Sequence, residues 1–167
     1  MKTRVALLAL AVALAACGKA AHNVAVQDPA ADTACALDGM LLLDHPGPKA
    51  QIHYAEGKPD YFCDLAEIFG LLQAPEQKRV VAAVYVQDMG KADWAHPQGH
   101  WVEARAAYFV VGSRKEGSMG PAIGSFAAQQ DAQAFAAKEG GKVVRFDEVK
   151  PDMLRQGGAA RDDDMSH

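Results

Sequence analysis

The stretch KAQIHYAEGKPDYFCDLAEIFGLL (residues 49–72) decides the fold, because its hydrophobic period changes part-way along. Residues 49–55 alternate around two apolar side chains and predict a strand, and residues 60–63 predict a second short strand after a Gly-Lys-Pro turn. Beyond them the apolar positions follow the helical spacing i, i+3, i+4, i+7: Leu65, Ile68, Phe69 and Leu72. Asp64 is the predicted N-cap of this helix.

The rest of the chain continues this pattern and then repeats it, with low sequence identity. A β-branched run at residues 80–86 is typical of a buried strand and closes a first β-β-α-β unit. The second unit is predicted from two strands, a helix capped by Gly140-Gly141 and a closing strand: residues 106–111, 121–126, 129–138 and 142–146. We therefore predict an α+β fold of two small ββαβ units in tandem, residues 35–90 and 91–150.

The first 16 residues have the order of a signal peptide, with Lys2 and Arg4 before an apolar run and two alanines at the end. The apolar run is about ten residues, short of the roughly 20 that a membrane-spanning helix needs. Leu14-Ala15-Ala16-Cys17 is similar to a lipobox, which implies cleavage before Cys17 and its lipidation. The glycine that follows, in place of aspartate, favours the outer membrane. An ordinary secretory signal with an incidental cysteine is the alternative.

Both ends of the mature chain are predicted to lack regular structure. Residues 17–34 are rich in alanine and small polar residues and predict a flexible tether. Residues 151–167, with two adjacent glycines and three adjacent aspartates, predict a disordered acidic tail. Acidic residues outnumber basic ones, 21 to 17, so we expect no nucleic-acid partner, which would require clustered Lys and Arg.

The remaining thiols, once Cys17 carries lipid, are Cys35 and Cys63. An envelope compartment permits a disulfide between them, and metal binding or inert burial are the other interpretations. Cys63 lies beside Phe62 and Leu65 and fits a small buried hydrophobe equally well. Neither the cysteine nor the histidine spacing matches a zinc template such as C-x2-C.

Two methionines are candidates for a shared metal site with these thiols. Met119 lies in a glycine-rich loop, residues 117–121, that offers little to pack against, and Met40 follows Cys35 by five residues. Soft thiolate and thioether donors select Cu(I), and neutral imidazole from His45 or His53 could complete the site. Met40 also precedes a run of three leucines and fits the core. The sequence contains no hydrolase elbow, phosphate-binding glycine motif or metalloprotease motif.

Taken together, several segments resemble the NosL family of envelope lipoproteins. They occur in order over nearly all of the predicted folded part: residues 35–51, 61–63, 117–121, and 140–149. The resemblance implies a copper chaperone, not an enzyme, that binds one Cu(I) ion and delivers it to nitrous oxide reductase. It also implies two ββαβ units, an arrangement shared with organomercurial lyase. Many relatives carry a cysteine directly before the methionine matching Met40, where this chain has Gly39.

The leading hypothesis is reversible Cu(I) binding in the periplasm by a lipid-anchored protein. Its candidate ligands are Met119, Met40, Cys35, Cys63, His45 and His53. The expected partners are nitrous oxide reductase and its membrane maturation complex. A second hypothesis is a carbon–metal bond lyase, with the two thiolates and Asp64 or Asp38 as proton donor. A third is a structural or docking lipoprotein with a Cys35–Cys63 disulfide.

Overall fold

The computed structural model describes residues 24–155, so the predicted signal peptide, the lipidation site Cys17 and the acidic end of the chain lie outside the described residues. The first sheet has four antiparallel strands in the order β2-β1-β3-β4. Its strands and its helix are β1 (Ala50–Tyr54), β2 (Asp60–Phe62), α1 (Leu65–Gln73), β3 (Val81–Gln87) and β4 (Trp101–Glu103).

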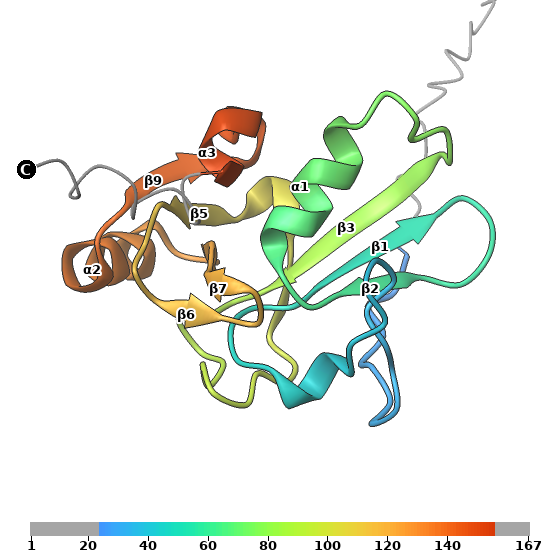
Figure 1. Cartoon of the computed structure of the whole chain (residues 1–167), viewed down its shortest axis with the longest axis horizontal. Helices are drawn as coiled ribbons and strands as arrows, with labels where there is room; N and C mark the ends of the chain where they lie inside the picture. Colours follow the sequence, from blue (N-terminus) through green and yellow to red (C-terminus); the bar gives the residue numbers. More distant parts are fainter. Residues whose placement is uncertain (1–23, 156–167) are drawn as a thin grey trace, which may run out of the picture.

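Helix α1 begins where the sequence predicts it. The Asp64 side chain accepts a hydrogen bond from the Ala66 backbone N–H at 2.7 Å, which satisfies one of the free donors at the helix start. The face formed by Leu65, Ile68 and Phe69 is buried, as the helical spacing requires. The helix therefore covers one face of the first sheet and fixes the residues at its own N-terminus (Figure 1).

The second unit repeats the topology of the first. Strands β5 (Tyr108–Val111), β8 (Gly124–Phe126) and β9 (Lys142–Arg145) form an antiparallel sheet in the order β8-β5-β9, which matches the order β2-β1-β3. Helix α2 (Gln129–Glu139) lies between β8 and β9 in the chain and ends at Gly140, whose φ of 79° glycine adopts at little cost. The predicted α+β class with two ββαβ units is confirmed.

Some elements differ from the prediction. Strand β4 comes after residue 90 in the chain but pairs with β3, so the first sheet takes a strand from the predicted second unit. The strand predicted at residues 121–126 is divided: β6 (Glu116–Gly117) and β7 (Gly120–Pro121) form a separate hairpin, and the ladder resumes at β8. Pro121, at the end of β7, has no backbone N–H to donate to a ladder, and the pairing with β5 begins only at Gly124.

Short helical segments complete the described chain. They are the 3-10 turns η1 (Leu42–Asp44), η2 (Ala104–Ala106) and η3 (Phe146–Glu148), and the helix α3 (Pro151–Arg155). Helix α3 falls in the part predicted as a disordered tail. It is ordered because Met153 and Leu154 pack against the core, and because the Gln73 side chain donates to the Val149 carbonyl at 3.0 Å.

Residues 24–28, here called the N-terminal segment, lie along the first sheet, although the sequence predicts a flexible tether there. Gln27 and the buried Gln51 side chain exchange two hydrogen bonds, at 3.1 and 3.0 Å. Tyr85 donates to the Val24 carbonyl and Trp101 to the Asp28 carboxylate, each at 2.7 Å. Buried amides such as Gln51 require partners, and the N-terminal segment supplies them.

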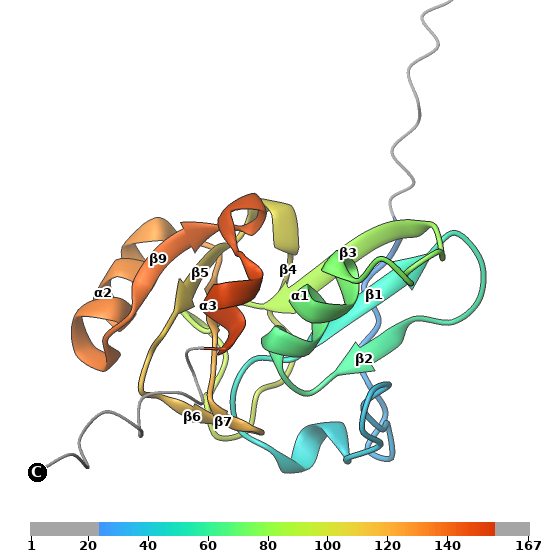
Figure 2. The same cartoon turned by 45° about the horizontal axis from the view of Figure 1, so that its top comes forward.

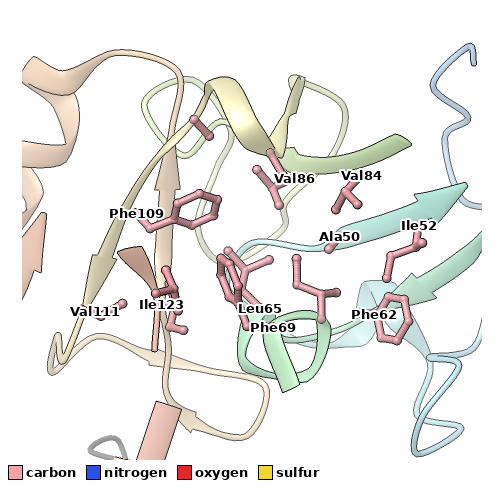
Figure 3. Close-up of a cluster of buried hydrophobic side chains, with 14 of the residues drawn as sticks. Ala50, Ile52, Phe62, Leu65, Phe69, Val84, Val86, Phe109, Val111 and Ile123 are labelled. Atoms are coloured by element: carbon pink, nitrogen blue, oxygen red, sulfur yellow. The ribbon is translucent and has the colours of Figure 1, made fainter. Parts of the chain in front are cut away.

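One hydrophobic core joins the two units. Phe69 of α1 meets Phe109 of β5 edge-on, with ring centroids 5.1 Å apart. Figure 3 shows side chains from both sheets around Phe69, and Figures 1 and 2 show the two sheets side by side. None of the helices formed by residues 24–155 has the length and apolar character required to span a bilayer.

Candidate metal site

Cys63 lies at the turn between β2 and α1, directly before the N-cap Asp64, and its side chain is buried. Strand β2 ends at Phe62, which points into the core, so strand alternation turns Cys63 toward the other face. There it contacts Cys35 and Leu42, in a small cluster separate from the main core. The thiol is therefore held between α1 and the loop that precedes η1.

Cys35 belongs to a tight loop, residues 34–41, that folds back onto β2. Ala34 bridges Leu41, and the Cys35 backbone N–H donates to the Met40 carbonyl at 2.8 Å. The Ala36 N–H donates to the Tyr61 carbonyl, also at 2.8 Å, which ties the loop to the strand that leads to Cys63. These bonds bring two cysteines that are distant in the sequence to one place.

Four donor side chains converge there, namely Cys35, Asp38, Cys63 and Glu67, and their ligand atoms all lie within 4.8 Å of one another. The Cys35 thiol donates to Glu67 Oε2 at 3.2 Å. The Cys63 thiol lies 3.8 Å from both Asp38 Oδ2 and Glu67 Oε2. Both cysteines are free thiols in this structure, and the disulfide of the third hypothesis is not formed. We call these four residues the thiol–carboxylate cluster.

The surroundings of the cluster keep its thiols protonated. Burial raises the pKa of Cys63 to about 12, and the neighbouring Glu67 carboxylate acts in the same direction. Burial also raises the pKa of Cys35 and of Glu67. The pKa of Asp38 is lowered, because its carboxylate accepts the Met40 backbone N–H at 2.9 Å. An incoming metal must therefore displace protons from the thiols.

A fully buried lysine stands beside the cluster. The Lys49 ammonium donates to the carbonyls of Pro46 and Cys63, at 3.0 and 3.2 Å. Burial lowers the pKa of Lys49 to about 8, against the opposing influence of Cys63 and other acidic groups nearby. The Cys63 carbonyl also accepts the Ser118 hydroxyl at 2.8 Å, so the β6–β7 hairpin reaches the same turn.

The six predicted ligands fall in different places. Cys35 and Cys63 are in the thiol–carboxylate cluster. Met119 is 61% exposed and follows Ser118, the hairpin residue whose hydroxyl donates to the Cys63 carbonyl. Met40 is half-buried, and its backbone closes the Cys35 loop.

The two predicted histidine ligands are not part of the cluster. His53 Nε2 lies 2.6 Å from Gln51 Oε1, and its ring meets Tyr85 edge-on, with the ring centroids 5.6 Å apart. Gln51 alternates with the core residue Ile52, so His53 belongs to the sheet face that the N-terminal segment covers. Burial lowers the pKa of His53. His45 is half-buried directly after η1.

A sequence model of the family described as NosL matches residues 26–154. The chain belongs to the NosL family. The protein named "Copper-binding lipoprotein NosL" of Stutzerimonas stutzeri is 38% identical over 151 residues, which cover 88% of this chain and 79% of that protein. A protein of the same name from Achromobacter cycloclastes is 37% identical over 164 residues, covering 92% and 84%.

A solved member of the NosL family has the same fold. The structure described as "Crystal structure of the copper chaperone NosL from Shewanella denitrificans" superposes with a TM-score of 0.73 and 41% sequence identity. The match covers 77% of this chain and 97% of that chain. The resemblance to NosL inferred from the sequence segments is therefore confirmed.

Sequence reasoning about this NosL-family chain missed Glu67 and Lys49, and considered Asp38 only as a proton donor. Asp64-x-x-Glu67 has the spacing of a capping box, in which the glutamate turns back toward the helix start and hence toward Cys63. That spacing was the available signal for Glu67. Lys49 carried no local signal for its place beside the cluster, because the Cys63 carbonyl that it binds belongs to a different turn of the chain. Asp64 itself caps α1 and is not in the thiol–carboxylate cluster.

Proposed function

We propose that this protein binds a single Cu(I) ion through the thiolates of Cys35 and Cys63, with Met119 as a third soft donor. The observation that carries the proposal is the convergence of the two free, buried thiols from separate parts of the chain. Sulfur donors favour monovalent copper over hard, oxygen-seeking ions. The relatives named as copper-binding proteins and as a copper chaperone support binding over the lyase alternative.

The buried surroundings of the thiols favour reversible copper binding, which a protein that delivers copper requires. Each thiol has to lose a proton that burial favours, so copper is bound less tightly than two ordinary cysteines would bind it. The exposed Met119 thioether adds a neutral donor on the outer side, where it can leave the ion without unfolding anything. The backbone carbonyl of Met40 closes the Cys35 loop, and its side chain is the alternative thioether.

The proposed role extends to location and partners. Cys17 follows a lipobox-like leader and two relatives are named as lipoproteins, so we propose a lipid-anchored protein in the periplasm, at the outer membrane. The proposed recipient is nitrous oxide reductase, reached directly or through its membrane maturation complex. The Shewanella denitrificans relative is described as a copper chaperone, which supports delivery rather than storage.

Copper binding is tested by titrating the metal-free mature chain with Cu(I) against a competing chelator under anaerobic, reducing conditions. Wild type should bind one ion, and a Cys35→Ser, Cys63→Ser double variant should lose stoichiometric binding. Val80→Ala is the control, because Val80 is a large exposed hydrophobic side chain outside the cluster. Unchanged affinity in the double variant would overturn the proposal.

Delivery is tested separately, by mixing the copper-loaded protein with copper-free nitrous oxide reductase. The proposal expects copper to appear in the reductase faster than from an equal concentration of the Cu(I)–chelator complex. A rate no greater than that of the chelator complex, with and without the membrane maturation complex, would restrict the protein to copper binding.

A further inference from the structure

The large apolar side chains that the described residues expose belong to two groups. They are Val26, Leu37, Leu41, Val80 and Met119. Leu37, Leu41 and Met119 lie in the Cys35 loop and in the hairpin that contacts the Cys63 turn. Val80, which is 71% exposed, and Val26, which is 38% exposed, belong to neither loop. The copper site therefore gives no reason for the exposure of these two valines.

Val80 lies beside the N-terminal segment, at the start of β3. Its carbonyl accepts the Ala55 backbone N–H at 2.8 Å, which places it next to the β1–β2 loop. Val24 and Val80 line one hollow in the surface, together with Tyr54, Ala55 and residues 81–82. We call Val24, Val80 and the two adjoining loops, residues 55–59 and 74–79, the anchor end.

The anchor end and the thiol–carboxylate cluster lie at opposite ends of the first sheet. Val81 pairs with Tyr54 at the end of β1, whereas Phe62, next to Cys63, pairs with Ala50 at its start. Each residue of a strand advances it by about 3.3–3.4 Å, so the five residues of β1 separate the two places by roughly 15 Å or more. Figure 1 shows the arrowhead of β1 together with the start of β3, and the arrowhead of β2 pointing the other way.

The charges of the anchor end balance one another. With the adjoining Asp60, its loops contain as many acidic as basic side chains: Glu56, Asp60, Glu76, Lys58, Lys78 and Arg79. Arg79 is paired with Asp60 at 2.7 Å, and its guanidinium lies over the Tyr54 ring. The chain as a whole has a net charge of −4. Anionic phospholipids therefore repel the anchor end less than they repel the rest of this acidic protein.

We propose that the anchor end rests on the membrane surface, with Val24 and Val80 among the lipid headgroups and the thiol–carboxylate cluster turned away from the bilayer. The inference rests on the proposed lipidation of Cys17 and is independent of copper binding. The chain enters the described part of the molecule at Val24, a few residues after Cys17, so the lipid is joined to the domain at this end.

The lipid and the surface have different tasks in this proposal. A few apolar side chains bind a bilayer only weakly and reversibly, and stable attachment requires a further signal such as an acyl chain. The lipid therefore supplies the attachment, and the anchor end only has to select one orientation of a domain that is already held nearby. Leu37, Leu41 and Met119 then face the aqueous side, where another protein can reach the cluster.

The test uses the full-length acylated protein, inserted into vesicles of phosphatidylethanolamine and phosphatidylglycerol. Val80→Trp introduces a fluorophore at the proposed contact, and phospholipids brominated in the upper acyl chain quench a tryptophan that reaches them. Leu37→Trp is the matched control, since Leu37 is 61% exposed in the Cys35 loop. The wild type accounts for the native Trp94 and Trp101.

A second set of the same proteins carries an insertion of about ten Gly-Ser residues after Gly18, which behaves as a flexible coil and lengthens the connection to the lipid. Hydrogen exchange of the wild type supplies a readout without any substitution. Its amides in residues 55–59 and 74–80 should exchange more slowly on vesicles than in detergent.

Val80→Trp should lose fluorescence to the brominated lipids with both the natural and the lengthened connection, and Leu37→Trp should not. Absence of quenching at position 80, equal quenching at both positions, or unchanged hydrogen exchange would overturn this inference alone. Quenching that disappears with the longer connection would also overturn it, because the short connection would then be its only cause. A purified protein whose mass lacks acyl chains would overturn the proposed anchoring as well.

Discussion

Lowering the pH from 8 to 6 should release copper from the protein, because the buried thiols that bind it take up protons. Burial itself also weakens copper binding, by an amount that follows from the pKa of Cys63. The pKa of Cys63 is raised from 9.0 to about 12 by burial. A shift of one unit corresponds to about 1.36 kcal/mol, so three units make its ionisation about 4 kcal/mol more costly than that of an ordinary cysteine. At neutral pH this weakens copper binding by about a thousandfold.

The dependence on pH follows from the same protons. Cys35 and Cys63 both have raised pKa values and are protonated at pH 6–8 when no metal is bound. Each thiol that becomes a ligand releases one proton, which tightens binding about tenfold per pH unit. Two ligating thiols therefore predict affinity about ten-thousandfold higher at pH 8 than at pH 6. Cys35→Ser should reduce this change to about a hundredfold.

The assay is chelator competition for Cu(I) at pH 6, 7 and 8, with the proton affinities of the chelator included in the analysis. Proton release on loading, measured in weakly buffered solution, gives the stoichiometry independently. A dissociation constant that is the same at pH 6 and pH 8 would refute the assignment of the thiols as ligands. A wild-type slope equal to that of Cys35→Ser would remove Cys35 from the site.

Three further predictions concern the surroundings of the cluster. Met119→Ala should weaken Cu(I) binding in competition titrations yet change the free energy of unfolding by less than about 0.5 kcal/mol, because the side chain is exposed; unchanged affinity would remove it from the ligand set. Relative to Lys49→Met, the wild type should gain about 1 kcal/mol of stability between pH 8 and 9, since Lys49 loses its proton near pH 8 when folded but keeps it to about 10.5 when unfolded. The raised pKa values of Cys35 and Cys63 lower the stability of both proteins over the same range, so the comparison isolates Lys49. Chemical denaturation of both proteins measures this difference, and an equal pH dependence in the two would assign the change to other groups. Gly117→Ala would place a Cβ 2.6 Å from the Ala122 Cβ, so it should cost about 1–3 kcal/mol in thermal unfolding, whereas an unchanged midpoint would show that the hairpin adjusts.

The elements that the sequence predicts are those that carry their own local pattern. Helix α1 has a capping aspartate and one apolar face, and α2 has a glycine at its end, so both were predicted within a residue or two. Strand β4 has only three residues and owes its place to pairing with β3. The N-terminal segment likewise has no hydrophobic pattern from which its place could be predicted. It is held by the side chains of Gln51 and Tyr85, which belong to distant strands.

The candidate site was predictable in its residue types and not in its geometry. The sulfur residues suggested soft-metal chemistry, but the contact between Cys35 and Cys63 arises from tertiary hydrogen bonds such as that from Ala36 to Tyr61. In the sequence Glu67 looks like a helix glutamate at the solvent, and only the structure places its carboxylate beside the Cys35 thiol. His53 was a reasonable candidate by type, but the face on which it lies follows from the pairing of β1 with β3.

The N-terminal segment limits how far the domain could travel from a lipid at Cys17. Val24 is hydrogen-bonded to the first sheet, and it lies seven residue steps after Cys17. A fully extended chain spans at most 3.3–3.6 Å per residue, so a lipid on Cys17, as proposed, could lie no more than about 25 Å from Val24. A domain held that close to a bilayer would meet partners embedded in or resting on the same membrane far more often than partners free in the surrounding volume.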